Sequence, residues 1–278
     1  SPAAPARPAQ VDPQAEIPQA AERALLAPAG AALIRNVSAE SGGLSFRLDL
    51  QTDGSEDFTA HWWETTRTLI GALYTRFPPS SSEIVDGRTI RIRIFDQKSV
   101  YERYASVFAP ENADALGYYD PAVREVVAWW SGDPQRLLGT LLHEATHLVL
   151  RDHLGHTNLP PWLDEGLASY HEVAALNGSD LQTGRVHATY ASLVRAELAS
   201  RAVFEEPATL AQSEAAGAGS GPLIGRDAVE RFCTLGFEGF AQVDAEARRL
   251  NYARAWSLVH FLIEGSGARF RPLFIAYL

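Results

Sequence analysis

The sequence predicts an α+β fold in which a mixed sheet and one central helix precede a region of helices. Residues 43–51 and 89–95 alternate apolar and polar side chains, as half-buried strands do. Beyond residue 133, apolar residues recur at helical spacing instead. A chain that places its strands first and its helices afterwards is typical of the α+β class.

Two helices and a hairpin are expected before the central helix. Residues 59–77 carry apolar side chains at helical spacing and stop at a pair of prolines, so they predict a helix. A second helix is expected over residues 99–108. Residues 118–130 predict a hairpin whose turn is Asp120-Pro121, because Asp-Pro is a common turn dipeptide.

The central helix is predicted from Asp133 to about Arg151. Asp133 is a suitable N-cap residue, and Pro134 suits the first helical position. His143 and His147 lie on the face opposite an apolar stripe, which indicates a helix whose second face borders a cleft. The predicted stripe consists of Leu138, Leu141, Leu142, Ala145, Leu148 and Val149.

The remainder of the chain predicts only helices. Pro160-Pro161 opens the next helix, which is expected to run to a C-cap signal at Asn177-Gly178. Residues 211–221 are rich in Gly, Ala and Ser and predict a flexible loop, and residues 244–264 predict a long amphipathic helix.

Composition excludes several classes of protein. The chain has 278 residues, of which 46% are hydrophobic, which is enough for one large domain or two small ones. The net charge of −10 argues against nucleic acid and anionic membrane surfaces as partners. Cys233 is the only cysteine, so an intrachain disulfide and a cysteine zinc site are excluded, and we expect it to pack in the core. No stretch approaches the roughly 20 apolar residues of a membrane span.

The first residues predict a tether rather than a folded element. Residues 1–20 are rich in Pro and Ala and lack an apolar period, so they are expected to be disordered. The chain begins at Ser1 and has no methionine. A removed signal peptide or a lipid anchor would fit this composition, which suggests a secreted or envelope-tethered bacterial protein. The pattern at the other end suggests that helix continues past Leu278.

The motif His143-Glu144-Ala145-Thr146-His147 is the most informative feature of the sequence. It sets two imidazoles one helical turn apart, as two ligands of one metal require, and Glu144 between them is placed as a general base. Glu165, 18 positions past His147, is expected to be the third ligand. Two nitrogens and one carboxylate oxygen leave the open position that a catalytic zinc needs for water. Gly166 is expected to allow a close approach of helices beside the metal.

Other side chains compete for places around this metal. His153 lies where a different zinc-protease pattern has its third ligand, but that pattern needs a glycine at position 150 and a methionine turn, and this chain has Leu150 and no methionine. His156 and His171 are expected to be solvated or to support a ligand. Candidates that could orient the ligand imidazoles are Asp164, Ser169 and Glu172.

These motifs resemble those of the gluzincin zinc peptidases, and most closely the bacterial peptidase MA-like families. The resemblance rests on residues 143–147, on Pro-Trp-Leu-Asp-Glu-Gly-Leu-Ala at 161–168, and more loosely on residues 252–262. It covers roughly residues 46–278. It implies a thermolysin-like fold of two lobes, over residues 21–157 and 158–278, with the cleft between them.

The resemblance also implies one further catalytic residue. Tyr252 matches the tyrosine that donates a hydrogen bond to the developing oxyanion in aminopeptidase N-like enzymes. From the residues alone, Tyr252 at the start of an amphipathic helix is as consistent with a core aromatic.

The sequence therefore predicts a zinc-dependent peptidase acting on peptides or proteins, with Glu144 as general base. The resemblance implies that substrate extends along an edge strand before the metal helix, for which we expect residues 123–130. Asp120 falls where aminopeptidases anchor a free amine, but its Asp-Pro context favours a turn, so an endopeptidase is expected. The alternatives are an aminopeptidase, a zinc hydrolase of another amide, and a weakly active or inactive zincin-fold binding protein of the cell envelope. The sequence does not indicate the oligomeric state.

Overall fold

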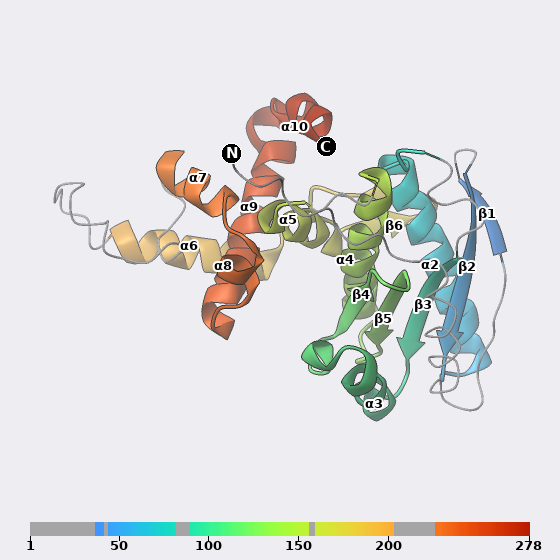
Figure 1. Ribbon diagram of the computed structural model, residues 1–278. Coiled ribbons are helices and arrows are strands. Elements are labelled where there is room, and N and C mark those ends of the chain that lie inside the picture. Colours follow the sequence, from blue (N-terminus) through green and yellow to red (C-terminus); the bar gives the residue numbers. More distant parts are fainter. Residues whose placement is uncertain (1–36, 42–43, 82–88, 156–158, 203–225) are drawn as a thin grey trace, which may run out of the picture.

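The computed structural model describes residues 37–41, 44–81, 89–155, 159–202 and 226–278 (Figure 1). The predicted tether over residues 1–20 and the predicted loop over residues 211–221 lie outside the described residues.

A five-stranded mixed sheet forms the first half of the fold, with the strand order β1-β2-β3-β5-β4 (Figure 1). The three inner strands run parallel to one another, and the two outer strands pair antiparallel to their neighbours. The mixed sheet together with several helices confirms the predicted α+β class. The strands are β1 (Val37–Ser41), β2 (Leu44–Thr52), β3 (Thr89–Phe95), β4 (Gly117–Asp120) and β5 (Glu125–Trp129).

Helices cover both faces of this sheet. α2 (Glu56–Arg76) and α4 (Pro134–His153) pack on one face, whereas α3 (Lys98–Phe108), followed by the short 3-10 helix η2 (Pro110–Asn112), packs on the other. Strand β5 follows the two-residue period of a pleated sheet, since Val126 and Ala128 join the first core and Val127 joins the second. The sheet therefore supports α4, the helix that carries the motif at residues 143–147.

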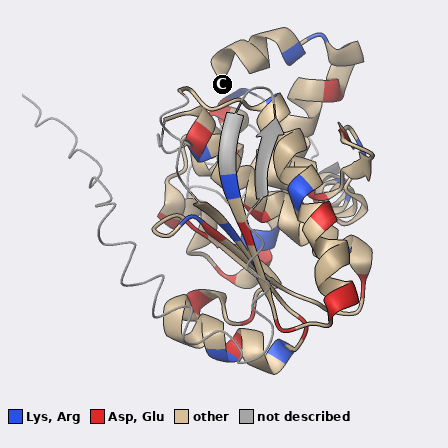
Figure 2. Cartoon of the chain, turned by 90° about the vertical axis from the view of Figure 1, so that its right-hand side faces the viewer, with Lys and Arg blue, Asp and Glu red and all other residues tan. Residues whose placement is uncertain are grey.

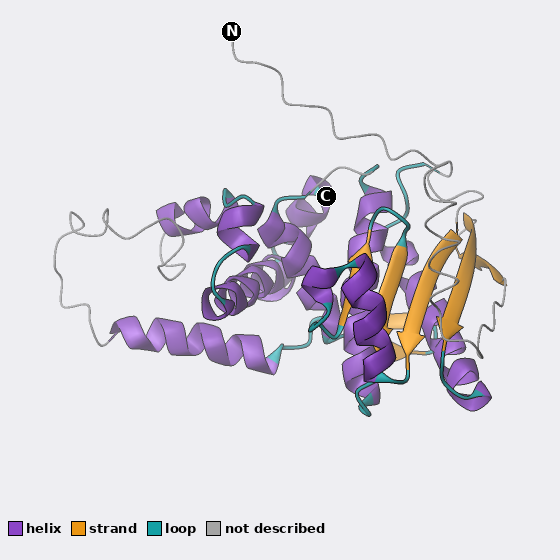
Figure 3. Cartoon of the chain, turned by 60° about the horizontal axis from the view of Figure 1, so that its bottom comes forward, coloured by secondary structure: helices purple, strands orange, loops and turns teal. Residues whose placement is uncertain are grey.

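Helices dominate the second half of the chain and lie together on one side of α4 (Figure 3). α9 loses helical geometry at Gly265–Gly267, so its regular part ends at Glu264 as predicted. Cys233, at the end of α7, packs against the core, as expected. The helices are α5 (Pro161–Glu172), α6 (Ala188–Ala202), α7 (Arg226–Cys233), α8 (Phe237–Ala241), α9 (Ala245–Ala268) and α10 (Arg271–Tyr277).

The predicted extent of the helix after Pro160-Pro161 is wrong. α5 ends at Glu172, and a two-stranded hairpin of β6 (Ala175–Asn177) and β7 (Asp180–Gln182) follows it. Gly178 has a φ of 59°, the left-handed conformation that two-residue hairpin turns require at their first position. The Asn-Gly pair is thus a hairpin turn rather than a helix cap, and the second half of the chain is not purely helical.

The prediction that residues 123–130 form an edge strand is also wrong. β5 pairs with β3 on one side and with β4 on the other, so it lies inside the sheet. The antiparallel hairpin itself is as predicted, with the Asp120 carboxylate accepting the Ala122 N–H at 2.9 Å in the turn. β4 is the edge strand next to α4.

Two charged groups fix the ends of α4. At its start, Asp133 Oδ1 accepts the N–H groups of Gln135 and Arg136 at 2.9 and 3.3 Å, as expected of an N-cap. Near its end, the fully buried Asp152 receives Arg124 from the β4–β5 turn and Tyr74 from α2. Removing one partner from such a buried pair typically costs about 3–5 kcal/mol. The start of α4 is therefore capped by its own N-cap residue, and its end is tied to α2 and to the β4–β5 turn.

Two glycines allow α5 to lie unusually close to its neighbours. A Cβ atom at Gly139 of α4 would stand 2.9 Å from the Glu172 carbonyl oxygen of α5. A Cβ atom at Gly166 of α5 would stand 2.8 Å from the Ala255 carbonyl oxygen of α9. The expectation for Gly166 is thus confirmed, with α9 as the approaching helix. α5 therefore packs between α4 and α9, and at these two glycines the helix backbones are in direct contact.

Acidic and basic residues are interspersed along the chain in the view from the β1 side of the sheet (Figure 2). Among the described residues, none of the helices combines the length and the apolar character that crossing a membrane requires.

Candidate metal centre

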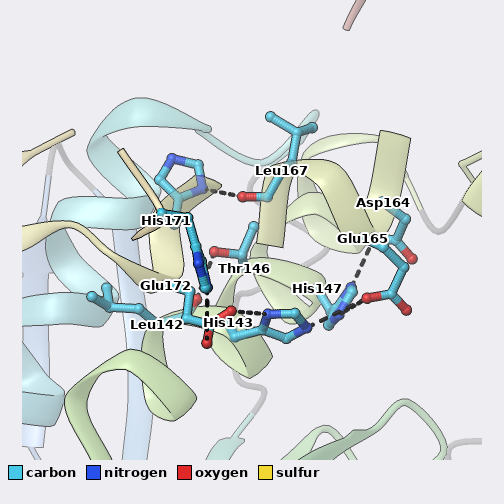
Figure 4. Close-up of polar contacts among 10 residues, drawn as sticks. Leu142, His143, Thr146, His147, Asp164, Glu165, Leu167, His171 and Glu172 are labelled. Carbon is cyan, nitrogen blue, oxygen red and sulfur yellow. Dashed lines mark hydrogen bonds and ion pairs between the residues drawn. The ribbon is translucent and has the colours of Figure 1, made fainter. Parts of the chain in front are cut away.

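The two motif histidines and Glu165 come together between α4 and α5 (Figure 4). Glu165 Oε2 lies 3.4 Å from His143 Nε2 and 3.7 Å from His147 Nε2. The possible ligand atoms of the three residues all lie within 4.8 Å of one another. Their side chains are only 13–18% exposed. The residues predicted as metal ligands are therefore adjacent, from two different helices.

The opposite nitrogen of each imidazole faces another carboxylate of α5. His147 Nδ1 lies 2.9 Å from Asp164 Oδ1, and His143 Nδ1 lies 3.3 Å from Glu172 Oε2 (Figure 4). An ionised carboxylate can only accept a hydrogen bond. Each neutral imidazole ring therefore carries its proton on Nδ1 and turns the Nε2 lone pair toward Glu165. Of the three orienting candidates, the structure thus places Asp164 and Glu172 against the imidazoles, whereas Ser169 is fully buried in α5.

The electrostatics of this cluster favour a positive charge at its centre. Burial opposes protonation of His147, but Asp164 and Glu165 outweigh it and raise its pKa to about 9. Burial likewise opposes protonation of His143, and bonds to Glu165 and Glu172 raise its pKa above the ordinary value. A divalent cation can supply the same charge in place of these protons.

One oxygen of Glu165 offers an independent test of whether a cation fits. Glu165 Oε2 is buried and, apart from the two imidazole nitrogens at 3.4 and 3.7 Å, has no hydrogen-bond partner among the described residues. A buried carboxylate oxygen without a partner is costly, so such an atom usually faces an ion or a water molecule. This oxygen is the one that lies between the two Nε2 atoms. Two imidazole nitrogens and one carboxylate oxygen are a donor set that zinc accepts.

Glu144 lies beside the cluster and faces strand β4. Burial raises its pKa, while the imidazoles of His143 and His147 and the backbone N–H of Tyr119 lower it, leaving a net rise. A carboxylate with a raised pKa that stands next to a candidate metal centre is suited to take up a proton and pass it on. Glu144 is thus a carboxylate of raised pKa adjacent to the candidate ligands.

The edge of β4 has backbone groups that face outward from the sheet. Leu116 and Trp129 form a hydrogen-bonded pair, and in an antiparallel ladder such pairs alternate with pairs that are not hydrogen-bonded. Gly117 and Tyr119 belong to the second kind, so their N–H and C=O groups point away from β5. Tyr119 uses its N–H on Glu144. No strand of the described residues pairs with this outer edge. The edge is thus open to an extended chain beside the candidate metal centre.

Tyr252, on the first turns of α9, also reaches this site. Burial raises the pKa of its hydroxyl group, and so do the charge of Glu165, a side-chain bond to Glu165 and the charge of Glu144. Its ring is half-buried and packs against Phe240 at 5.5 Å between ring centres. The hydroxyl group therefore points toward the candidate ligands, whereas the ring contributes to the core.

His187 is a site residue that the sequence reasoning missed. Its Nε2 lies 3.7 Å from Glu172 Oε1, its Nδ1 accepts the Tyr190 N–H at 3.3 Å, and its ring stacks on Tyr190 with 3.8 Å between centres. His143 and His187 together lower the pKa of Glu172 to about 2, against the effect of burial. Glu172 is thus held by imidazoles on both sides. His187 follows the hairpin of β6 and β7 and belongs to no motif, so no sequence signal pointed to it.

His153 and His171 take no part in the cluster. His153 Nδ1 bonds to the Pro78 carbonyl oxygen at the end of α4, so it is not placed as a ligand. The expectation that His171 is solvated or supports a ligand is wrong: it is 1% exposed and donates from Nδ1 to the Leu167 carbonyl oxygen at 2.9 Å. It is a core residue against Phe77. His156 lies outside the described residues.

Comparison of the chain with known protein families and with curated proteins found no match.

We expect His171 to make the fold sensitive to acid. Burial and the neighbouring Arg76 lower its pKa to about 3, whereas an unfolded histidine titrates near 6.5. Between these values the unfolded chain binds the additional proton, so stability falls as the pH falls, by up to about 1.4 kcal/mol per pH unit. His171→Asn should flatten this dependence between pH 6 and pH 4 in urea unfolding of the metal-free protein.

The matched control is His61→Asn on the exposed side of α2, which should keep the wild-type dependence on pH. If His171→Asn and His61→Asn show the same slope as the wild type, His171 is not the group responsible.

Proposed function

We propose that the protein is a zinc-dependent peptidase with a gluzincin-type site in a thermolysin-like, two-lobed arrangement. The observation that carries this proposal is the convergence of His143 Nε2, His147 Nε2 and the buried Glu165 Oε2, with both Nδ1 atoms engaged by carboxylates. Such a set is a ligand sphere with its orienting groups already in place. Glu144, Tyr252 and the open edge of β4 surround it with the groups that peptide hydrolysis needs.

Zinc bound by these three residues would supply Lewis-acid activation of a water molecule and polarise the carbonyl group of the substrate. Glu144 takes the proton of the attacking water and delivers it to the leaving amine. The Tyr252 hydroxyl group donates a hydrogen bond to the charge that develops on the carbonyl oxygen. The outer edge of β4 binds the substrate backbone through the N–H and C=O groups of Gly117 and the C=O group of Tyr119, whose N–H bonds to Glu144.

An endopeptidase accounts for the site better than an aminopeptidase. The aminopeptidase alternative needs an acidic group at the end of β4 to bind a free amine, and Asp120 is the residue at that place. Its carboxylate instead accepts the Ala122 N–H and closes the β4–β5 turn. A substrate with a blocked N-terminus is therefore expected to be accepted.

The main alternative from another class is a binding protein with the zincin fold and little or no turnover. Such a protein needs neither the general base nor the oxyanion donor. Here Glu144 and Tyr252 both face the candidate ligands, which favours an enzyme. Mutation of these two residues separates the classes.

We expect the purified protein to bind one zinc ion per chain. His147→Ala should abolish stoichiometric binding, and Asp164→Ala should weaken the affinity by about 10–100-fold because it orients His147. Competition with a chromophoric chelator measures both. His153→Ala, at the end of the same helix, is the control and should bind as the wild type does. Loss of zinc from this control, together with full binding by Glu165→Ala, would show that the ligand set is wrong.

Glu144→Gln should keep zinc and lose activity. Loss of a general base lowers kcat by about 10²–10⁴-fold, measured by mass spectrometry on an N-acetylated peptide cleaved by the wild type. Glu102→Gln, at an exposed pair with Lys98, is the matched control. Equal cleavage by Glu144→Gln at equal zinc content contradicts the peptidase proposal. Cleavage confined to peptides with a free N-terminus, lost in Asp120→Asn, supports the aminopeptidase instead.

Tyr252→Phe should lower kcat by about 10²–10³-fold with little change in KM, because the hydrogen bond forms mainly in the transition state. Tyr104→Phe makes the same change at a buried tyrosine that bonds to Glu125 on the far side of the sheet, and should leave kcat unchanged. A fully active but less heat-stable Tyr252→Phe protein would identify Tyr252 as a core residue only.

A further inference from the structure

A cavity of about 430 Å3 opens beside the candidate metal centre, between the end of α4, the start of α5 and α8. This volume lies in the range of sites that enclose small ligands. Its apolar lining combines the buried side chains of Leu150 and Phe240 with Leu159, Pro161 and Phe237. Phe237 is 61% exposed, so its ring is accessible to an occupant of the cavity.

The remaining lining connects the cavity to the site. Glu165 and its neighbour Asp164 form part of the wall, and Arg151 stands on α4 one turn beyond His147. The carboxylates of Glu165 and Asp164 already face the imidazoles of His143 and His147, and most of the other lining residues are apolar. The lining therefore favours an apolar occupant, and its size favours a large one.

The direction of β4 indicates which part of a substrate reaches the cavity. A Cβ atom at Gly117 would touch Thr140, and the Tyr119 N–H bonds to Glu144, so β4 and α4 run the same way. Leu150 and Arg151 come later on α4, which sets the cavity beyond the Asp120 end of β4. Antiparallel pairing is the more stable mode, and a chain added antiparallel to β4 has its N-terminal part at that end.

We infer that this cavity is the specificity pocket of the site and takes one large apolar or aromatic side chain from the residues on the N-terminal side of the cleaved bond. The inference rests on the proposed peptidase function. Continuity of the cavity with Glu165 argues for a substrate side chain as the occupant, since a chain bound along β4 and over the metal passes its mouth.

The test uses the zinc-loaded full chain and a library of N-acetylated peptides, with cleavage positions read by mass spectrometry. Phe, Tyr, Trp and Leu should be enriched at one fixed position before the cleaved bond. Phe237→Ala should lower the ratio of kcat/KM for a Phe peptide over its matched Ala peptide by about 10-fold. Leu159→Trp, which narrows the cavity, should shift the preference to small side chains. Phe261→Ala, at a 49% exposed position on α9, should change neither.

Binding gives a second readout that does not depend on turnover. Calorimetry with the Glu144→Gln protein should show weaker binding of the Phe peptide after Phe237→Ala and no such loss after Phe261→Ala. Cleavage by the wild type with no side-chain preference, or a preference unchanged in both pocket variants, overturns the pocket and leaves the peptidase proposal standing. No cleavage by the zinc-loaded wild type and no binding by Glu144→Gln overturns both.

Discussion

The close contact of α5 with α4 is the constraint on which the site depends. Gly139 brings the backbone of α5 to within van der Waals reach of α4, so that three carboxylates of α5 stand beside two imidazoles of α4. The positions of the three carboxylates along α5 then determine which imidazole nitrogen each one faces. Glu165 faces both Nε2 atoms, and Asp164 and Glu172 take the outer nitrogens. A bulkier residue at 139 would push these helices apart by more than a metal–ligand bond tolerates.

A second layer of interactions keeps this contact in place. Asp152 ties the end of α4 to α2 and to the β4–β5 turn through Tyr74 and Arg124, all of them buried. On the other side, Gly166 lets α9 approach α5 and brings Tyr252 over Glu165. The groups proposed to act in catalysis therefore lie on helices, whereas the proposed substrate edge lies on a strand whose turn is held by the same Arg124. For the proposed peptidase, these packed elements would prepare the site in advance for a charged reaction centre.

Much of the fold and of the donor set could be predicted from the sequence because both depend on local periodicity. The strand at 89–95 and the apolar stripe of α4 follow from spacing alone, and so does the pairing of His143 with His147. The order of strands does not, since β5 and β4 are equally plausible edges until their pairing is known. Asn177-Gly178 was ambiguous because the same dipeptide ends helices and turns hairpins. His187 reaches Glu172 only through tertiary packing, and nothing near it in the sequence marks it.

The order of these residues along the chain has a consequence for how the protein folds. Every candidate ligand and both orienting carboxylates lie on α4 and α5, which follow each other directly, whereas Tyr252 comes from α9, far along the chain. Contacts of low sequence separation form early, because little loop-closure entropy opposes them. A cation can therefore be captured by a nascent pair of helices before α9 docks. For the proposed zinc peptidase, metal capture and catalytic competence would then be two successive events of synthesis, and a chain interrupted between them would hold metal without the means to turn over a substrate.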